Sequence, residues 1–181
     1  NSDAIERLAI QESTALMYPL SVIGAHVSDC PNHTVGRVTP FETRGIIAMA
    51  GTFGYELDVT KIPEEDRDMI ASQVETYKKY CPLIQSGDYY RIASYQNNHY
   101  FDCYEIVSKD KKEAIFVFVQ VIAQPNMHSI RVKLKGLDNE AKYKINGTVY
   151  DADALMNGGF IIKRPWGDFQ AELFHIEKIN D

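Results

Sequence analysis

The chain of 181 residues is 45% hydrophobic and 24% charged, with a formal net charge of −6, a composition that is typical of a globular protein and not of a disordered one. A negative net charge without a dense basic patch excludes nucleic acid as an expected partner. No apolar run approaches the roughly 20 residues that span a bilayer, and the charged first residues are unlike a signal peptide, so we expect no membrane partner.

The first half of the chain alternates between helical and strand-like patterns. Thr39 is expected to cap the middle helix, with Pro40 at its first position and Glu42 completing a capping box. This alternation predicts an α/β fold with a parallel sheet, and two strands need further neighbours to form one. The predicted elements are a helix over 3–17, a strand over about 21–27, a helix from about 40, a strand over 54–59 and a helix over about 63–84.

From residue 88 onward the helical periodicity nearly disappears. Ile130 and Val132 alternate with charged residues, which indicates a sheet with one dry face, and Asn146-Gly147 predicts a type I′ turn. We therefore expect an antiparallel β-sandwich or related barrel over 88–181, after a separate α/β portion over 1–87. The strand-like runs are 89–94, 100–107, 113–123, 129–137, 143–150, 159–163 and 169–179.

Polar side chains gather where the first predicted strand ends, which is where barrel and doubly wound enzymes build pockets. An equally weighted alternative is a turn whose Asn and Asp side chains hydrogen-bond their own backbone. Arg37 is expected to form an ion pair with Asp29 or Glu42. The candidate site residues are His26, Ser28, Asp29, Asn32 and His33, together with Asp58 after the second strand.

Other chemistries are less favoured by the same residues. Ser28 lies between His26 and Asp29 without a nucleophile elbow, which disfavours a hydrolytic triad. Nothing fixes the spacing of the histidines as a metal site requires, so no metal is expected. Trp166 lies at a β turn, where we expect a packing plug in preference to an aromatic platform for a sugar.

The three cysteines, at positions 30, 81 and 103, lack the short paired spacings of zinc or redox sites. Their odd number also argues against a complete disulfide framework. Free thiols in a reducing cytoplasm are therefore the expectation.

Six short segments stand out together because of their order and spacing: Asp3–Leu8, Tyr18-Pro19, His26–His33, Phe53–Asp58, Leu134–Asp138 and Asp153–Gly159. They resemble the C-terminal part of the bacterial-type α-galactosidases of glycoside hydrolase family 36. The resemblance covers essentially the whole chain. It implies that the first half supplies the last two strand-helix units of a (β/α)8 barrel, followed by a C-terminal antiparallel β-sandwich domain.

The resemblance implies hydrolysis of terminal α-galactosides such as melibiose and raffinose, with retention of configuration and without a cofactor. Two Asp do this work in the family, with carboxyl groups about 5–5.5 Å apart. The acid/base Asp lies immediately before the family segment that Asn1–Ala4 matches, and the nucleophile lies farther upstream. Asp3 falls three positions past the acid/base, so both catalytic Asp are expected to be missing and the chain alone to be inactive.

The implied partners are α-galactoside sugars, bound by the complete barrel, and the upstream barrel and N-terminal domain of a parent protein. Homo-oligomerisation is left open. His26, Asp29, Asn32 and His33 either bind the sugar or brace the loops that do. The alternative function is a non-catalytic carbohydrate-binding or structural β module, but the apolar first half suits a barrel better than a free appendage.

Overall fold

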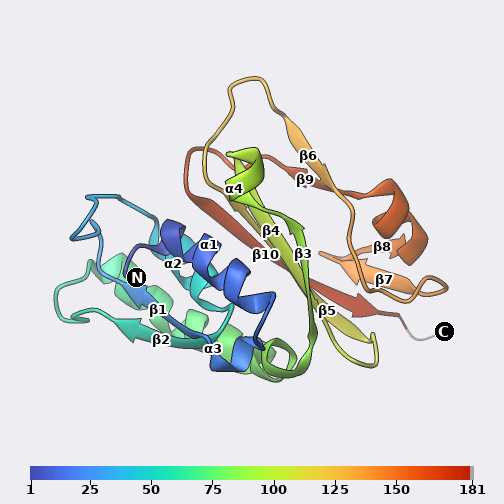
Figure 1. Cartoon of the computed structure of the whole chain (residues 1–181), viewed down its shortest axis with the longest axis horizontal. Helices are drawn as coiled ribbons and strands as arrows, with labels where there is room; N and C mark the ends of the chain where they lie inside the picture. Colours follow the sequence, from blue (N-terminus) through green and yellow to red (C-terminus); the bar gives the residue numbers. More distant parts are fainter. Residues whose placement is uncertain (180–181) are drawn as a thin grey trace. The chain divides into compact units, whose positions relative to one another are not determined.

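The computed structural model describes residues 1–179 and divides into two compact units, Asn1–Gln85 and a second that begins at Ser86 (Figure 1). Each unit contains a hydrophobic cluster of its own.

The first unit is an α/β arrangement around two parallel strands. It consists of α1 (Ala4–Ala15), the 3₁₀ turn η1 (Leu20–Val22), β1 (Gly24–Ser28), α2 (Phe41–Ala48), β2 (Thr52–Glu56) and α3 (Glu64–Ser86). The parallel register pairs His26 with Gly54 and Ser28 with Glu56. Val27 and Phe41 are buried in the cluster that joins the strands to α2. The predicted order of helices and strands is confirmed.

The starts of these elements follow local hydrogen bonds. Asp3 caps α1, because its Oδ2 accepts from the Glu6 N–H at 3.1 Å. The predicted cap of α2 is wrong: Pro40 is the capping residue and makes no side-chain bond. The Thr39 carbonyl instead accepts from Nε of Arg44 at 2.9 Å, so a side chain of the first turn folds back over the helix start.

The second unit is an antiparallel β-sandwich (Figure 1). Its six-stranded sheet has the order β3-β4-β5-β10-β7-β8, and β6 and β9 form the other sheet. The strands are β3 (Asp88–Ala93), β4 (Phe101–Val107), β5 (Glu113–Gln120), β6 (Ser129–Val132), β7 (Lys142–Ile145), β8 (Thr148–Asp151), β9 (Phe160–Lys163) and β10 (Gln170–Lys178).

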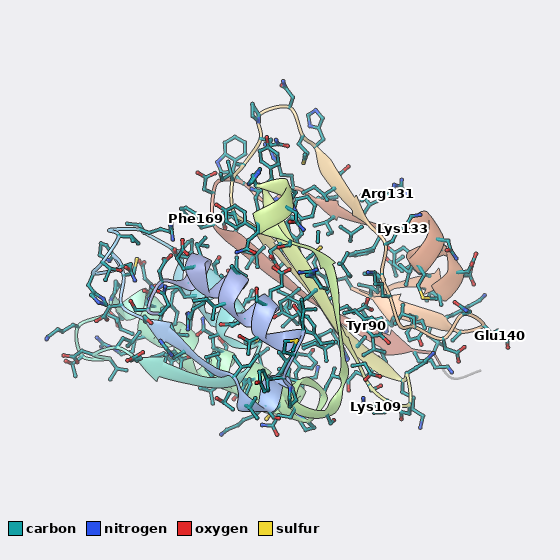
Figure 2. All side chains as sticks on the ribbon, in the orientation of Figure 1. Tyr90, Lys109, Arg131, Lys133, Glu140 and Phe169 are labelled. Carbon is teal, nitrogen blue, oxygen red and sulfur yellow. The ribbon has the colours of Figure 1, made fainter. Side chains whose placement is uncertain are left out.

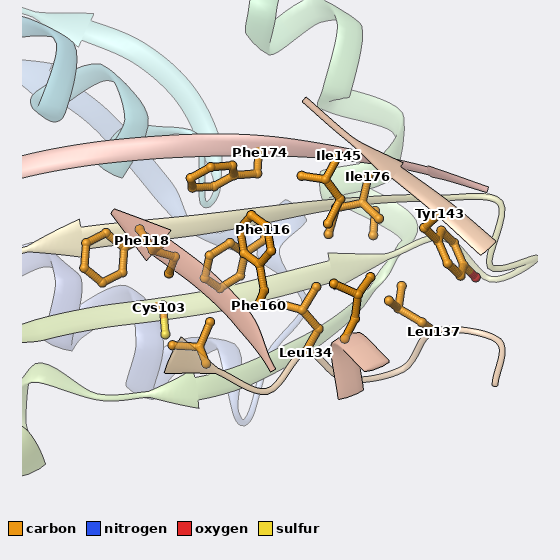
Figure 3. Close-up of a cluster of buried hydrophobic side chains, with 14 of the residues drawn as sticks. Cys103, Phe116, Phe118, Leu134, Leu137, Tyr143, Ile145, Phe160, Phe174 and Ile176 are labelled. Atoms are coloured by element: carbon orange, nitrogen blue, oxygen red, sulfur yellow. The ribbon is translucent and has the colours of Figure 1, made fainter. Parts of the chain in front are cut away.

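Aromatic side chains fill the space between the two sheets (Figure 3). Phe160 of β9 meets Phe116 of β5 and Phe174 of β10, with ring centroids 6.2 Å and 5.3 Å apart. Their edge-on geometry is the favoured one for aromatic pairs. The predicted dry face is therefore the face that each sheet turns toward the other.

Two short helical turns were not predicted, α4 (Tyr95–Asn98) and the π-helical η2 (Ala154–Gly158). Neither is long enough for apolar spacing to reveal a helical period. The hairpin between β4 and β5 carries Lys109, which is exposed to solvent (Figure 2).

The turn between β7 and β8 has left-handed φ angles at both central residues, 48° at Asn146 and 81° at Gly147, as a type I′ turn requires. We expect Gly147→Ala to lower the free energy of unfolding by about 1 kcal/mol, because a Cβ disfavours the left-handed conformation. Thermal unfolding measures this. In the control Gly158→Ala, an added Cβ meets nothing within 4 Å and φ is not left-handed; equal losses in both variants would contradict the explanation.

Candidate functional site

The loop that follows β1, residues 29–39, is shaped by Asn32. Its Oδ1 accepts from the Thr34 N–H at 3.0 Å, the Thr34 hydroxyl at 2.6 Å and the Val35 N–H at 3.1 Å. Its Nδ2 donates to the Ser2 hydroxyl at 3.1 Å. These bonds are the ones expected of a turn in which an Asn side chain hydrogen-bonds the nearby backbone. Asn32 is 5% exposed, and it gives the loop a defined shape.

Two arginines tie this loop to the helices around it. Arg37 pairs with Asp3 at the start of α1, across 34 residues of sequence. The sequence prediction named Asp29 or Glu42 and did not include this partner, because it considered only neighbours in the chain. The buried Arg44 donates to the Ser28 carbonyl at 2.6 Å.

Arg44 also reaches beyond the loop. Its Nη2 lies 3.3 Å from Oδ2 of Asp66 in α3, and its guanidinium lies 5.0 Å from the centre of the Phe41 ring. Arg44 therefore contacts four groups, which are the Ser28 and Thr39 carbonyls, the Asp66 carboxylate and the Phe41 ring. It is the main cross-link between the end of β1, the loop and two helices.

His26 and Glu56 meet across the two parallel strands, with Nε2 and Oε2 2.6 Å apart. Burial, and next the positive charge of Arg7, lower the pKa of His26, while Glu56 opposes them. The Arg7 guanidinium donates to the His26 carbonyl, and burial lowers the pKa of Arg7 to about 10. Glu56 was not predicted as a site residue, since only the parallel register shows that it lies beside the end of β1.

The remaining candidates differ in exposure. Asp29 and His33 are exposed on the loop, whereas Ser28 is 3% exposed. Asp58 is held in a turn by the Thr60 hydroxyl at 2.6 Å and by Lys61 at 3.1 Å, and these hydrogen bonds lower its pKa to about 2. Asp58 therefore stays ionised as the anchor of its own turn.

Several of these groups line one small cavity of about 10 Å³, which has room for one water molecule at most. A sugar is therefore not enclosed by this loop alone. The lining residues are Ser2, Asp3, Ala4, Asp29, Cys30, Asn32, Arg37, Thr39 and Arg44.

Over residues 1–179, no group of three His, Cys, Asp or Glu side chains is arranged to hold a metal ion. No helix there has the length and apolar character to cross a membrane.

Comparisons with known proteins match both units. The profile of the Melibiase family matches residues 1–87, and that of the glycosyl hydrolase family 36 C-terminal domain matches residues 101–176. Alpha-galactosidase Mel36A of Lactobacillus acidophilus is 42% identical over 99% of this chain, and alpha-galactosidase AgaA of Geobacillus stearothermophilus is 41% identical over 99%. The chain spans about a quarter of each, 25% of the relative's length.

Solved structures agree with the sequence matches. A variant of the Geobacillus stearothermophilus enzyme in complex with raffinose superimposes with a TM-score of 0.94 at 40% identity, over 99% of this chain and 25% of that one. The predicted fold class, the end of a barrel followed by an antiparallel β domain, is confirmed.

Proposed function

Because this chain belongs to glycoside hydrolase family 36, we propose that it is the C-terminal part of a retaining α-galactosidase that hydrolyses terminal α-galactosides such as melibiose and raffinose. The observation that carries the proposal is the match of two consecutive family profiles, over 1–87 and 101–176, with α-galactosidases about 40% identical along the same length. The boundary near residue 87 separates the end of the catalytic barrel from the β domain.

The chain's part in this reaction is to close the barrel, and both catalytic carboxylates come from the upstream part of the parent protein. Retaining hydrolysis needs one carboxylate as nucleophile and one carboxylic acid as proton donor, with their carboxyl groups about 5–5.5 Å apart. Asp3, which the sequence brings nearest to the expected acid/base, is 2% exposed, caps α1 and pairs with Arg37. Its carboxylate is occupied by these structural roles.

Sugar contact from this chain falls to the loop after β1. Asp29 and His33 are exposed on a loop of fixed shape, and together they offer the acceptors and donors that sugar hydroxyls need. Asn32 positions the loop through its own hydrogen bonds. His26, beside Glu56, supports the same edge of the strand pair.

The test uses the parent protein with raffinose, following kcat, KM and the first anomer released by NMR. We expect α-galactose as the first product, and a fall in kcat/KM of about 10- to 100-fold in His33→Ala, the loss of one or two hydrogen bonds to the sugar. Asn32→Ala is expected to lower the melting temperature as well, because three donors of the loop lose their acceptor.

Val35→Ala is the matched control, because this side chain is 56% exposed on the same loop. It should leave both kcat/KM and the melting temperature unchanged. Absence of galactose release by the intact parent protein would overturn the proposed activity. Unchanged kinetics in His33→Ala would overturn only the role of the loop.

The cysteines support a cytoplasmic location. Cys30, Cys81 and Cys103 form no disulfide within residues 1–179, which favours a reducing environment and hence the cytoplasm.

A further inference from the structure

Trp166, the single Trp of the chain, lies in the turn between β9 and β10 and is 88% exposed. The sequence prediction of a packing plug is therefore wrong for the part of the chain that the structure describes. A large apolar ring held in water is a feature that needs a reason, because burying it elsewhere in the fold would stabilise the protein.

The backbone on both sides of Trp166 is hydrogen-bonded to a buried side chain of β5. Gln120 is 2% exposed, and its Nε2 donates to the Pro165 carbonyl at 2.9 Å and the Gly167 carbonyl at 2.5 Å. These two carbonyls flank the Trp. The turn that carries the indole is therefore anchored to the end of β5 and is preorganised to present the ring.

Two further contacts join this turn to the segment after β5. Asp168 accepts from the Ala123 N–H at 2.7 Å, and the Arg164 guanidinium donates to the Gln124 carbonyl. The Arg164 N–H donates to the His128 carbonyl at 3.3 Å. The turn therefore lies beside residues 124–129, and Phe169 marks where it joins the start of β10 (Figure 2).

Residues 124–129 line an open hollow of about 570 Å³, a size within the range of small-ligand sites, about 300–1,000 Å³. Its polar lining comes from Gln124, Asn126, His128 and Ser129. These amide, imidazole and hydroxyl groups include both donors and acceptors. The exposed indole and a hollow that offers these polar groups thus lie on two segments that are hydrogen-bonded to each other.

We propose that Trp166 and this hollow form a carbohydrate-binding site on the β-sandwich unit, for a neutral oligosaccharide. A pyranose ring has C–H groups on one face, which stack on an indole, and hydroxyls around its rim, which need the donors and acceptors of the hollow. A protein partner would favour a broad contiguous apolar surface, whereas four of the six residues that line the hollow carry polar side chains. The site needs no catalytic carboxylate and is independent of the proposed hydrolysis.

The test exploits the single Trp of the chain as its own reporter. Raffinose and stachyose are titrated into the purified chain while the indole fluorescence is followed. We expect a saturable change with a dissociation constant on the order of 1 mM. By calorimetry, Trp166→Ala should weaken binding at least 10-fold and His128→Ala several-fold, while circular dichroism shows both variants folded.

Val149→Ala, at a side chain 51% exposed on β8 of the same unit, is the matched control and should bind as the unaltered chain does. Absence of a fluorescence change up to about 50 mM sugar would overturn the proposal. So would a blue shift of the emission that grows with protein concentration without sugar, because the ring would then dock on a second protein surface.

Discussion

The free energy of unfolding is expected to fall by about 4–5 kcal/mol as the pH rises from 4.5 to 8, because the unfolded chain releases over this range a proton that the buried Glu105 carboxyl keeps in the folded chain. Glu105 is 0% exposed on β4. Its Oε2 accepts from the Lys135 N–H at 2.7 Å, and its Oε1 has no hydrogen-bond partner among residues 1–179. Burial raises its pKa from 4.5 to about 8, and each unit of pKa corresponds to about 1.4 kcal/mol.

The direction follows from proton counts. Between pH 4.5 and 8 the folded chain keeps a proton on Glu105 that the unfolded chain has released. Stability from this group is therefore complete below pH 4.5 and is lost as the pH rises through the pKa of the folded state.

Glu105→Gln removes this dependence, because the amide oxygen can still accept from Lys135 and carries no charge. The variant should match the unaltered chain near pH 4.5 and exceed its stability at pH 8, as measured by urea unfolding across the range. Glu140→Gln, at an exposed carboxyl (Figure 2), is the control and should keep the original slope. Parallel curves for the Glu105 variant and the unaltered chain would contradict the assignment.

The second large effect is expected from Arg44→Met, at about 3–4 kcal/mol of lost stability. The Met side chain preserves much of the apolar stem but leaves the Ser28 and Thr39 carbonyls and the Asp66 carboxylate without their donor. Each buried acceptor left unpaired costs about 1–3 kcal/mol, and breaking a buried ion pair adds to this. Chemical denaturation measures the loss.

Arg67→Met is the matched control in α3, because Arg67 is exposed and its Nη2 makes a single 3.2 Å bond to the Ile62 carbonyl. It should change stability by less than about 0.5 kcal/mol. Equal losses in the two variants would mean that Arg44 is not the cross-link that holds the end of β1.

Local patterns predicted most of the fold. Apolar spacing located α3, alternation located β6, and the Asn146-Gly147 pair located the turn between β7 and β8. The prediction extended the first strand too far back because Leu20–Val22, just after Pro19, forms a 3₁₀ turn. A short apolar run of this kind has the same residue types in a 3₁₀ turn as in a strand, so the sequence alone does not distinguish the two.

The interactions of the candidate site were harder to predict because they join distant positions. Arg37 finds Asp3, and His26 finds Glu56, only after the parallel strands and α1 are assembled. The exposure of Trp166 likewise depends on Gln120, which fixes the turn from another strand. Local sequence patterns therefore predict which residue types are available, but the contacts between distant residues depend on the folded arrangement of the strands and helices.

The central claim is that this chain completes an α-galactosidase without carrying its catalytic carboxylates. The most direct measurement is turnover of a nitrophenyl α-galactoside by the rigorously purified 181-residue chain. We expect no hydrolysis above the buffer rate, because Asp3 is engaged by Arg37 and by the start of α1. An enzyme-like rate that co-purifies with the folded chain would contradict the account.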